Sequence, residues 1–279
     1  MPEPTGGWRV VRRLGLLAVM VAASLAAGGA AGAWGRKGHA VVALIAEEHL
    51  TPKTRAAVDA LLASEGSDSM VAVASWADFE RRDSPTPTPF HSATLPGNHR
   101  PYDGSRKMCH KNNCIIAAVQ HDVEVLRDPG AAEADKVVAL KYLIHFVGDM
   151  HQPMHVTRAG RGQLVTFHGE TVTLHTVWDR DVVTARSDKV GAIVRRVEKT
   201  ARPENAGDID PVHWAEEGRD ITRDRILVRA LADPEKVTVL PDDYAVENWP
   251  IARDQLMLAG LRLANTLNSI FDPPVADRD

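Results

Sequence analysis

The chain has 279 residues, a formal net charge of −4 at pH 7 and only two cysteines. A protein that binds nucleic acid mainly by neutralising phosphates with Lys and Arg would be basic, so this composition excludes that class. If the protein acts on phosphate groups, bound metal ions must supply the positive charge.

The first 33 residues have the pattern of a cleavable export signal. Three arginines precede an apolar run over residues 14–27, and Ala31-Gly-Ala33 provides the small residues of a cleavage site. The run is short and rich in Ala and Gly, which favours cleavage over a membrane anchor. We expect residues 34–279 to form one exported domain, periplasmic or secreted, that begins at Trp34. Cleavage removes three arginines and one glutamate, which changes the net charge from −4 to −6.

Helical periodicity dominates the mature chain and predicts an all-α domain. Five prolines between residues 81 and 102 predict a loop, and the β-branched, Gly-containing segment 160–177 predicts an irregular excursion with a short hairpin. The expected helices span residues 39–50, 54–63, 68–78, 114–126 and 135–150, two or more lie between 181 and 232, and the last spans 252–271.

Cys109 and Cys114 are the only cysteines. In an exported protein, a lone pair this close in the sequence indicates a local disulfide. The spacing is too wide for a C-x-x-C redox motif. A metal site with two thiolates is the alternative, and an oxidising compartment disfavours it.

The segment from Lys141 to His155 organises the chain. His145 and Asp149 are four residues apart, so they share one face of a helix. Pro153 disfavours further helix, and the turn beyond it presents His155. A carboxylate in the last helical turn meets the negative end of the helix dipole, which is unfavourable unless a positive charge is close. A divalent metal would supply that charge; the alternative is a buried His–Asp hydrogen bond without metal.

Further metal donors occur along the chain. Cleavage would free the α-amino group of Trp34, which loses its proton easily and can chelate a metal together with its own carbonyl oxygen. His175 and Asp179 are again four residues apart. The full set of donors is Trp34, His39, Asp78, His91, His145, Asp149, His155, His175 and Asp179. This N/O set without cysteine suits hydrolytic zinc, and it is too large for one ion, so two or three ions are expected.

In their order along the chain, these residues resemble the exported zinc-dependent single-strand nucleases, which comprise the fungal nucleases S-one and P-one and the plant bifunctional nucleases. The resemblance covers essentially the whole mature chain. It rests on Trp34-Gly-x-x-Gly-His39, Ser75-Trp-Ala-Asp78, His91, the Cys109 and Cys114 pair, His145-x3-Asp149-x5-His155, Leu174-His-x-x-Trp-Asp179 and the segment 255–268. The resemblance implies an almost all-helical fold with three zinc ions at the bottom of a cleft.

The family pattern also implies how the donors divide between the zinc ions. It assigns one ion to Asp78, His91, His145 and Asp149, a second to His155, His175 and Asp179, and a third to the amine and carbonyl of Trp34, His39 and Asp149. Asp149 would therefore bridge two ions. This accounts for a carboxylate at the end of its helix.

The activity implied by the resemblance is hydrolysis of phosphodiester bonds in single-stranded RNA and DNA. A hydroxide between two zinc ions attacks the phosphorus in line, Asp78 orients the water, and the remaining zinc stabilises the leaving 3′ oxygen. The products are 5′-phosphorylated nucleotides, and 3′-nucleotides are dephosphorylated. The expected protein is a monomer without a stable protein partner.

Three positions depart from the family pattern. Ser92 follows His91 where the family usually has an aromatic residue that stacks on the nucleotide. Gln163 stands where an asparagine usually contacts the base, and Ala77 replaces a residue that is aromatic in some members. The metal ligands are complete, whereas base preference is open.

Two other functions compete with the nuclease. Zinc-dependent phospholipase C shares the N-terminal Trp, three zinc ions and the H-x3-D-x5-H element. It usually ends in H-x3-E and separates its Trp and first His more widely, so Asp179 and the step from Trp34 to His39 favour a nuclease. Phospholipid remains an alternative substrate. A non-catalytic zinc module would usually have a closed site with cysteines, which this chain lacks.

Overall fold

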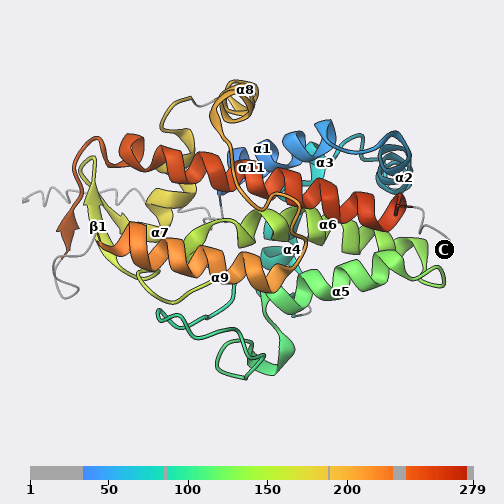
Figure 1. Ribbon diagram of the computed structural model, residues 1–279, viewed down its shortest axis with the longest axis horizontal. Helices are drawn as coiled ribbons and strands as arrows, with labels where there is room; N and C mark the ends of the chain where they lie inside the picture. The colour runs from blue at the N-terminus through green and yellow to red at the C-terminus, as the bar shows by residue number, and fades with distance from the viewer. Residues whose placement is uncertain (1–33, 85–86, 188, 229–236, 275–279) are drawn as a thin grey trace, which may run out of the picture.

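Helices make up most of the computed structural model, which describes residues 34–84, 87–187, 189–228 and 237–274 (Figure 1). The expected export signal lies outside these residues. The helices are α1 (Gly35–Glu48), α2 (Pro52–Ala63), α3 (Met70–Val73), α4 (Trp76–Asp83), α5 (Ile115–Arg127), α6 (Glu133–Met150), α7 (Leu174–Val177), α8 (Val190–Thr200), α9 (Pro211–Ile221) and α11 (Tyr244–Phe271). Two short 3-10 helices, η1 (His110–Asn112) and η2 (Pro153–His155), and two π-helical segments, η3 (Trp178–Val182) and η4 (Thr222–Leu227), lie between them. The mainly helical prediction is confirmed. In these ranges, no helix is long and apolar enough to cross a membrane.

Helix α6 lies at the centre of the fold. It contacts α1, α2, α3, α4, α5, α9 and α11, and 13 of its 18 residues are buried. A helix that is apolar on nearly every side is expected in the middle of a bundle. Its last turn is therefore sealed from solvent, and His145 and Asp149 are both fully buried.

The last helix, α11, packs along α1 and begins earlier than predicted. The prediction of a start at Ala252 was wrong, because α11 begins at Tyr244 and includes Pro250. Pro250 is exposed, so the carbonyl that loses its helical hydrogen bond lies on the side that faces water. Gly260 permits the close approach of α1, since an added Cβ would lie 2.4 Å from Ile45.

The predicted helix over residues 68–78 is wrong as a single element. The structure contains two short helices, α3 and α4, separated at Ala74 and Ser75. Ser69 caps α3 by accepting a hydrogen bond from the Ala72 N–H at 3.2 Å. The break places Asp78 in the first turn of α4, where the helix dipole favours a carboxylate. It also frees the Ala74 carbonyl for a bond to His145.

The predicted hairpin is present as β1 (Leu164–Phe167) and β2 (Glu170–Thr173), which pair antiparallel with Val165 opposite Val172. A third strand, β3 (Thr238–Val239), pairs parallel to β1 and was not predicted, because two residues carry no readable alternation. The hairpin leads directly into α7 and η3, which carry His175 and Asp179 back to the interior.

Candidate metal centre

Four donor atoms from three segments converge at the end of α6. The Nδ1 atom of His91 lies 3.1 Å from His145 Nε2, and Asp149 Oδ2 lies 3.0 Å from the first and 3.3 Å from the second. Asp78 Oδ1 lies 3.7 Å and 3.8 Å from the same two nitrogens. Ligands about 2.0–2.1 Å from a tetrahedral zinc are about 3.3 Å from one another. The distances from each carboxylate to the two histidines are therefore near the required length, whereas Asp149 belongs to a different compact group from Asp78.

Backbone carbonyls fix the orientation of two of the predicted imidazole ligands, His145 of this group and His155 of the next. His145 Nδ1 donates to the carbonyl of Ala74 at 2.8 Å, and His155 Nδ1 donates to the carbonyl of His91 at 2.9 Å. In the neutral ring, the second nitrogen then presents a lone pair to the interior. Histidines that bind metals are usually oriented in this manner.

The second group contains His155, His175 and Asp179, whose donor atoms lie within 4.8 Å of one another. The two imidazole rings stack with their centroids 4.6 Å apart, and His175 Nδ1 lies 3.3 Å from Asp179 Oδ2. Gln152 donates to Asp179 Oδ1 at 2.6 Å, and Oδ2 has no hydrogen-bond partner within the described residues. No pattern in the sequence indicates that Gln152 would hold this carboxylate.

A third group forms where α1 crosses α6. His39 Nε2 lies 3.2 Å from Asp149 Oδ1, and the His39 ring stacks on His145 with centroids 3.9 Å apart. Gly148 makes room for this ring, because an added Cβ would lie 2.8 Å from His39 Nδ1. Asp149 thus offers one oxygen to each of two groups.

Trp34 lies at the same end of the interior and is fully buried. Its backbone N–H hydrogen-bonds the Asp179 carboxylate, and its carbonyl accepts the N–H of Gly38 at 3.0 Å. The compact group around Asp149 Oδ1 contains His39 and His145, and Trp34 is not part of it. In the uncleaved chain the Trp34 nitrogen is a peptide nitrogen, which has no lone pair for a metal.

Buried polar atoms without partners concentrate in these groups. In the described part of the chain, eleven buried side-chain N or O atoms lack a hydrogen-bond partner, and eight of them belong to the predicted His and Asp donors. The eight are His39 Nδ1 and Nε2, Asp78 Oδ1, His91 Nε2, Asp149 Oδ1, His155 Nε2, His175 Nε2 and Asp179 Oδ2. Because native interiors satisfy nearly all buried polar groups, such a concentration is typical of groups that could hold metal ions.

The protonation states suit metal binding. Burial lowers the pKa of His39 and holds that of His155 well below the usual value, with the neighbouring His145 and His175 acting in the same direction. Burial also lowers the pKa of His175 to about 4. Such histidines are neutral at pH 7 and keep the lone pair that a metal needs.

The two buried carboxylates of the centre differ. Burial raises the pKa of Asp179 well above its usual value, and nearby Asp149 adds to this effect. Burial opposes ionisation of Asp149 too, but His145, His39 and His91 outweigh it and hold the pKa of Asp149 well below normal, while Asp149 raises the pKa of His145. A cation beside Asp179 would compensate for its burial.

The comparison with known proteins places the chain. A family model described as S1/P1 nuclease matches residues 34–272. The chain belongs to this family. Nuclease S1 of Aspergillus oryzae is 27% identical over 270 residues, which cover 86% of this chain and 93% of that protein. Endonuclease 3 of Arabidopsis thaliana is 28% identical over 295 residues, with 95% and 97% covered. Nuclease P1 of Penicillium citrinum is 32% identical over 157 residues, with 52% and 57% covered.

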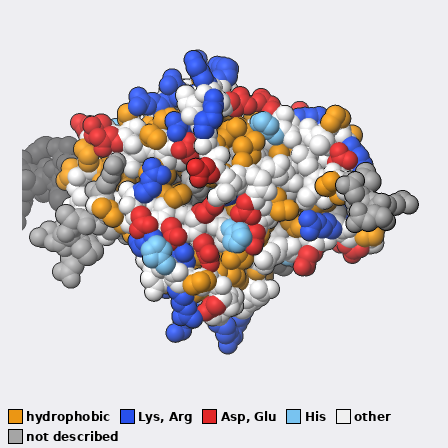
Figure 2. Space-filling model, in the orientation of Figure 1, with side chains coloured by type: hydrophobic (Ala, Val, Ile, Leu, Met, Phe, Trp, Pro, Cys, Tyr) orange, Lys and Arg blue, Asp and Glu red, His pale blue; other side chains and the backbone are white. Residues whose placement is uncertain are grey.

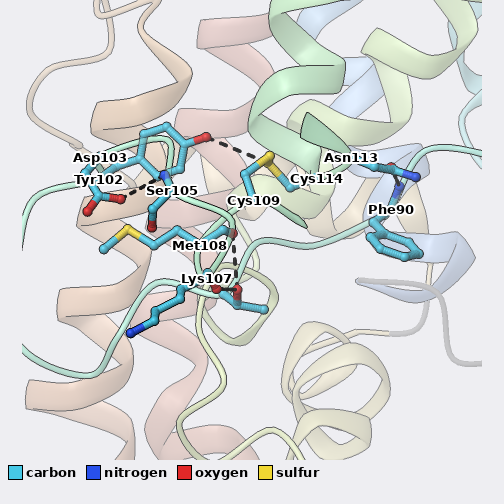
Figure 3. Close-up of a disulfide and its surroundings, with 10 residues drawn as sticks. Phe90, Tyr102, Asp103, Ser105, Lys107, Met108, Cys109, Asn113 and Cys114 are labelled. Carbon is cyan, nitrogen blue, oxygen red and sulfur yellow. Dashed lines mark hydrogen bonds between the residues drawn. A yellow bond between two sulfur atoms is a disulfide. The ribbon is translucent and has the colours of Figure 1, made fainter. Parts of the chain in front are cut away.

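The resemblance noted from the motifs is confirmed. As an S1/P1 nuclease, the protein is a hydrolase that acts on phosphodiester bonds, and its buried His and Asp groups are suited to metals. The expected disulfide between Cys109 and Cys114 is present as well (Figure 3).

Proposed function

We propose that the protein is a zinc-dependent endonuclease that cleaves single-stranded RNA and DNA to 5′-phosphorylated nucleotides and also removes phosphate from 3′-nucleotides. The observation that carries this proposal is the convergence of the donor atoms of Asp78 and Asp149 on His91 and His145, at distances of 3.0–3.8 Å. Family membership supplies the reaction class. A narrow, buried centre suits an unstacked strand better than a duplex.

Three zinc ions fit the donors available. Asp78, His91, His145 and Asp149 would hold one ion, His155, His175 and Asp179 a second, and His39, Asp149 and the Trp34 amine and carbonyl a third. When bound, zinc supplies a Lewis acid and lowers the pKa of a bound water. Neutral His39, His155 and His175 suit this role without release of a proton.

Asp78 is the carboxylate placed to act on water. Its side chain is 17% exposed, whereas those of Asp149 and Asp179 are 0% and 2% exposed. Arg81 Nη2 lies 3.6 Å from Asp78 Oδ1. We infer that Asp78 accepts a hydrogen bond from the attacking water and so orients it toward the phosphorus.

Export would complete the centre. Cleavage after Ala33 converts the Trp34 nitrogen from a peptide N–H, now bonded to Asp179, into an amine that can bind a metal. The enzyme would then become fully active only outside the cytoplasm, in the periplasm or as a secreted monomer.

The test is release of acid-soluble nucleotide from single-stranded RNA by the mature protein. We expect release that stops with a chelator, returns with zinc and is much weaker on double-stranded RNA. Vesicles of phosphatidylcholine serve as the second substrate. Hydrolysis of phospholipid without hydrolysis of RNA would contradict the nuclease and favour the phospholipase alternative. Inactivity of the zinc-loaded protein on both substrates would contradict any phosphodiesterase.

A further inference from the structure

A cavity of about 660 Å³ adjoins the metal centre. We call it the disulfide-loop pocket. Its walls come from three segments: Phe90 to Gly97, the segment from Arg106 to Cys114, which ends in the loop that the disulfide closes from Cys109, and the pair Arg158 and Ala159. Ser92, in its wall, directly follows His91 of the metal centre.

The charges around this pocket have one sign. Arg106, Lys107 and Arg158 line it and are exposed, and no Asp or Glu is among its lining residues. None of these three cations forms an ion pair within the described residues. Some arginines elsewhere on the surface pair with the aspartate that follows them, as in Arg180–Asp181 and Arg223–Asp224. Figure 2 shows Lys and Arg side chains gathered at the top of the molecule as well as at the bottom. Unpaired cations around one cavity in a net-acidic protein indicate an anionic ligand.

Two residues that line the pocket carry polar hydrogen-bond donors. Arg161 donates to Ser92 Oγ at 3.1 Å, so the hydroxyl oxygen is occupied and its proton is free to be donated. Asn113 Oδ1 accepts the N–H of Phe90 at 2.9 Å, so the side-chain NH2 group of Asn113 is the part that can donate to a ligand. Both donors lie among the lining residues.

The walls are held firmly. Arg161 also donates to the carbonyls of Ala93 at 3.2 Å and His155 at 2.6 Å, which ties the pocket wall to the metal centre. Thr94 Oγ1 donates to the carbonyl of Lys107 at 2.7 Å, just before the loop that the disulfide closes. Figure 3 shows the disulfide between Lys107 on the left and Phe90 on the right, and Phe90 is 52% exposed.

We propose that the disulfide-loop pocket binds a second phosphate group of the substrate, one that flanks the scissile phosphodiester. Arg106, Lys107 and Arg158 supply the charge, and Ser92 and Asn113 supply neutral donors. The inference rests on the proposed phosphodiesterase function. It gives Ser92 a role that an aromatic residue at this position could not have, namely a hydrogen bond to phosphate in place of stacking on a base.

The test compares dinucleotides on the zinc-loaded mature enzyme. A dinucleoside monophosphate has only the scissile phosphate, and the same compound with a 5′-phosphate or a 3′-phosphate adds one flanking group. Cleavage of the internal bond is followed by chromatography, which separates it from loss of the terminal phosphate. We expect the flanking phosphate at one end to lower KM by about tenfold, which corresponds to about 1.4 kcal/mol, with kcat little changed. Added salt should reduce the gain.

The variant Arg106→Gln/Lys107→Gln/Arg158→Gln should lose this gain and keep its zinc content. A matched control removes three exposed cations of α8, as Arg195→Gln/Arg196→Gln/Lys199→Gln. Helix α8 lies at the top of Figure 1 and the loop at the bottom. The single variant Arg158→Gln, which should lose part of the gain, covers the case in which the triple variant does not fold.

The outcomes separate the two proposals. No internal cleavage of any dinucleotide would overturn the proposed function and the pocket with it. Cleavage with no effect of a flanking phosphate, or with an effect that survives in the triple variant, would overturn the pocket alone. An equal loss in the α8 control would show general attraction and overturn it as well.

Discussion

The metal centre and the disulfide-loop pocket meet at His91 and Ser92, yet they are built in opposite ways. The centre is buried, and several of its donor atoms have no hydrogen-bond partner within the described residues. Helices and hydrogen bonds such as that from His145 to the Ala74 carbonyl hold these side chains in place. The pocket is open and contains exposed cations on loops. The difference indicates a division of roles, in which the centre provides the reaction and the pocket selects what reaches it.

Loss of Asp149 is expected to have the largest effect. The variant Asp149→Ala removes an oxygen from two metal groups and leaves His39, His91 and His145 without their shared partner. Activity should fall by about a thousandfold or more, and zinc content should decrease. Metal analysis and nucleotide release measure both. Near-normal turnover with full zinc would contradict the bridging role of Asp149.

Arg161 connects the two regions, so its loss should affect both. Its guanidinium is largely buried and bonds Ser92, Ala93, Met154 and His155. In the variant Arg161→Gln those carbonyls lose their donors, which should lower the free energy of unfolding by about 2–4 kcal/mol and reduce kcat. Arg161→Lys should restore part of the stability. Urea unfolding and steady-state kinetics are the measurements, and a variant with wild-type values in both would remove Arg161 from the account.

The sequence predicted the centre better than the pocket for a physical reason. His145 and Asp149, like His175 and Asp179, are four residues apart, so helical geometry alone brings each pair together. The break between α3 and α4 could not be read from the apolar pattern, because it is stabilised by the tertiary bond from His145 to Ala74. Arg106 and Arg158 meet across loops more than fifty residues apart, and no local spacing records that.

Helical geometry predicts the direction of the His151 side chain but not its contact with Arg262. His151 faces away from the donors, as the helical angle implies, and burial lowers its pKa to about 3. Its Nδ1 donates to the Val147 carbonyl at 2.7 Å, and Nε2 accepts from Arg262 at 3.0 Å. The bond to Arg262 joins α6 to α11, and it depends on an approach between helices that the sequence does not show.

Asp122 sharpens the comparison, because it is buried like Asp149 but forms no ion pair with a histidine within the described residues. It is 5% exposed, its Oδ2 lacks a partner, and burial raises its pKa to about 8. Since an unfolded Asp ionises near pH 4, the wild-type protein should lose stability between about pH 4 and pH 8, by up to about 1.4 kcal/mol per pH unit. The variant Asp122→Asn should lack this component.

Urea unfolding of wild type and Asp122→Asn at pH 5 and pH 8 measures the effect. The stability of the variant relative to wild type should rise with pH, while its nuclease activity stays the same. A difference that is constant across this range would mean that Asp122 does not titrate as its burial implies.

The disulfide should have the smallest effect, and only on the pocket. The variant Cys109→Ser/Cys114→Ser opens a short loop, so the free energy of unfolding should fall by about 2 kcal/mol. KM for a dinucleotide with a flanking phosphate should rise, and zinc content should remain unchanged. Loss of zinc on removal of the disulfide would show that the two regions are not separable.

The most direct test of the account is the zinc content of two versions of the mature chain. One begins at Trp34, and the other carries a single alanine before it, which turns the Trp34 amine into a peptide nitrogen. We expect three zinc ions per chain in the first protein. In the second protein we expect two zinc ions and the loss of most of the hydrolytic rate. Equal zinc content and equal rates would contradict the Trp34 site and activation by cleavage.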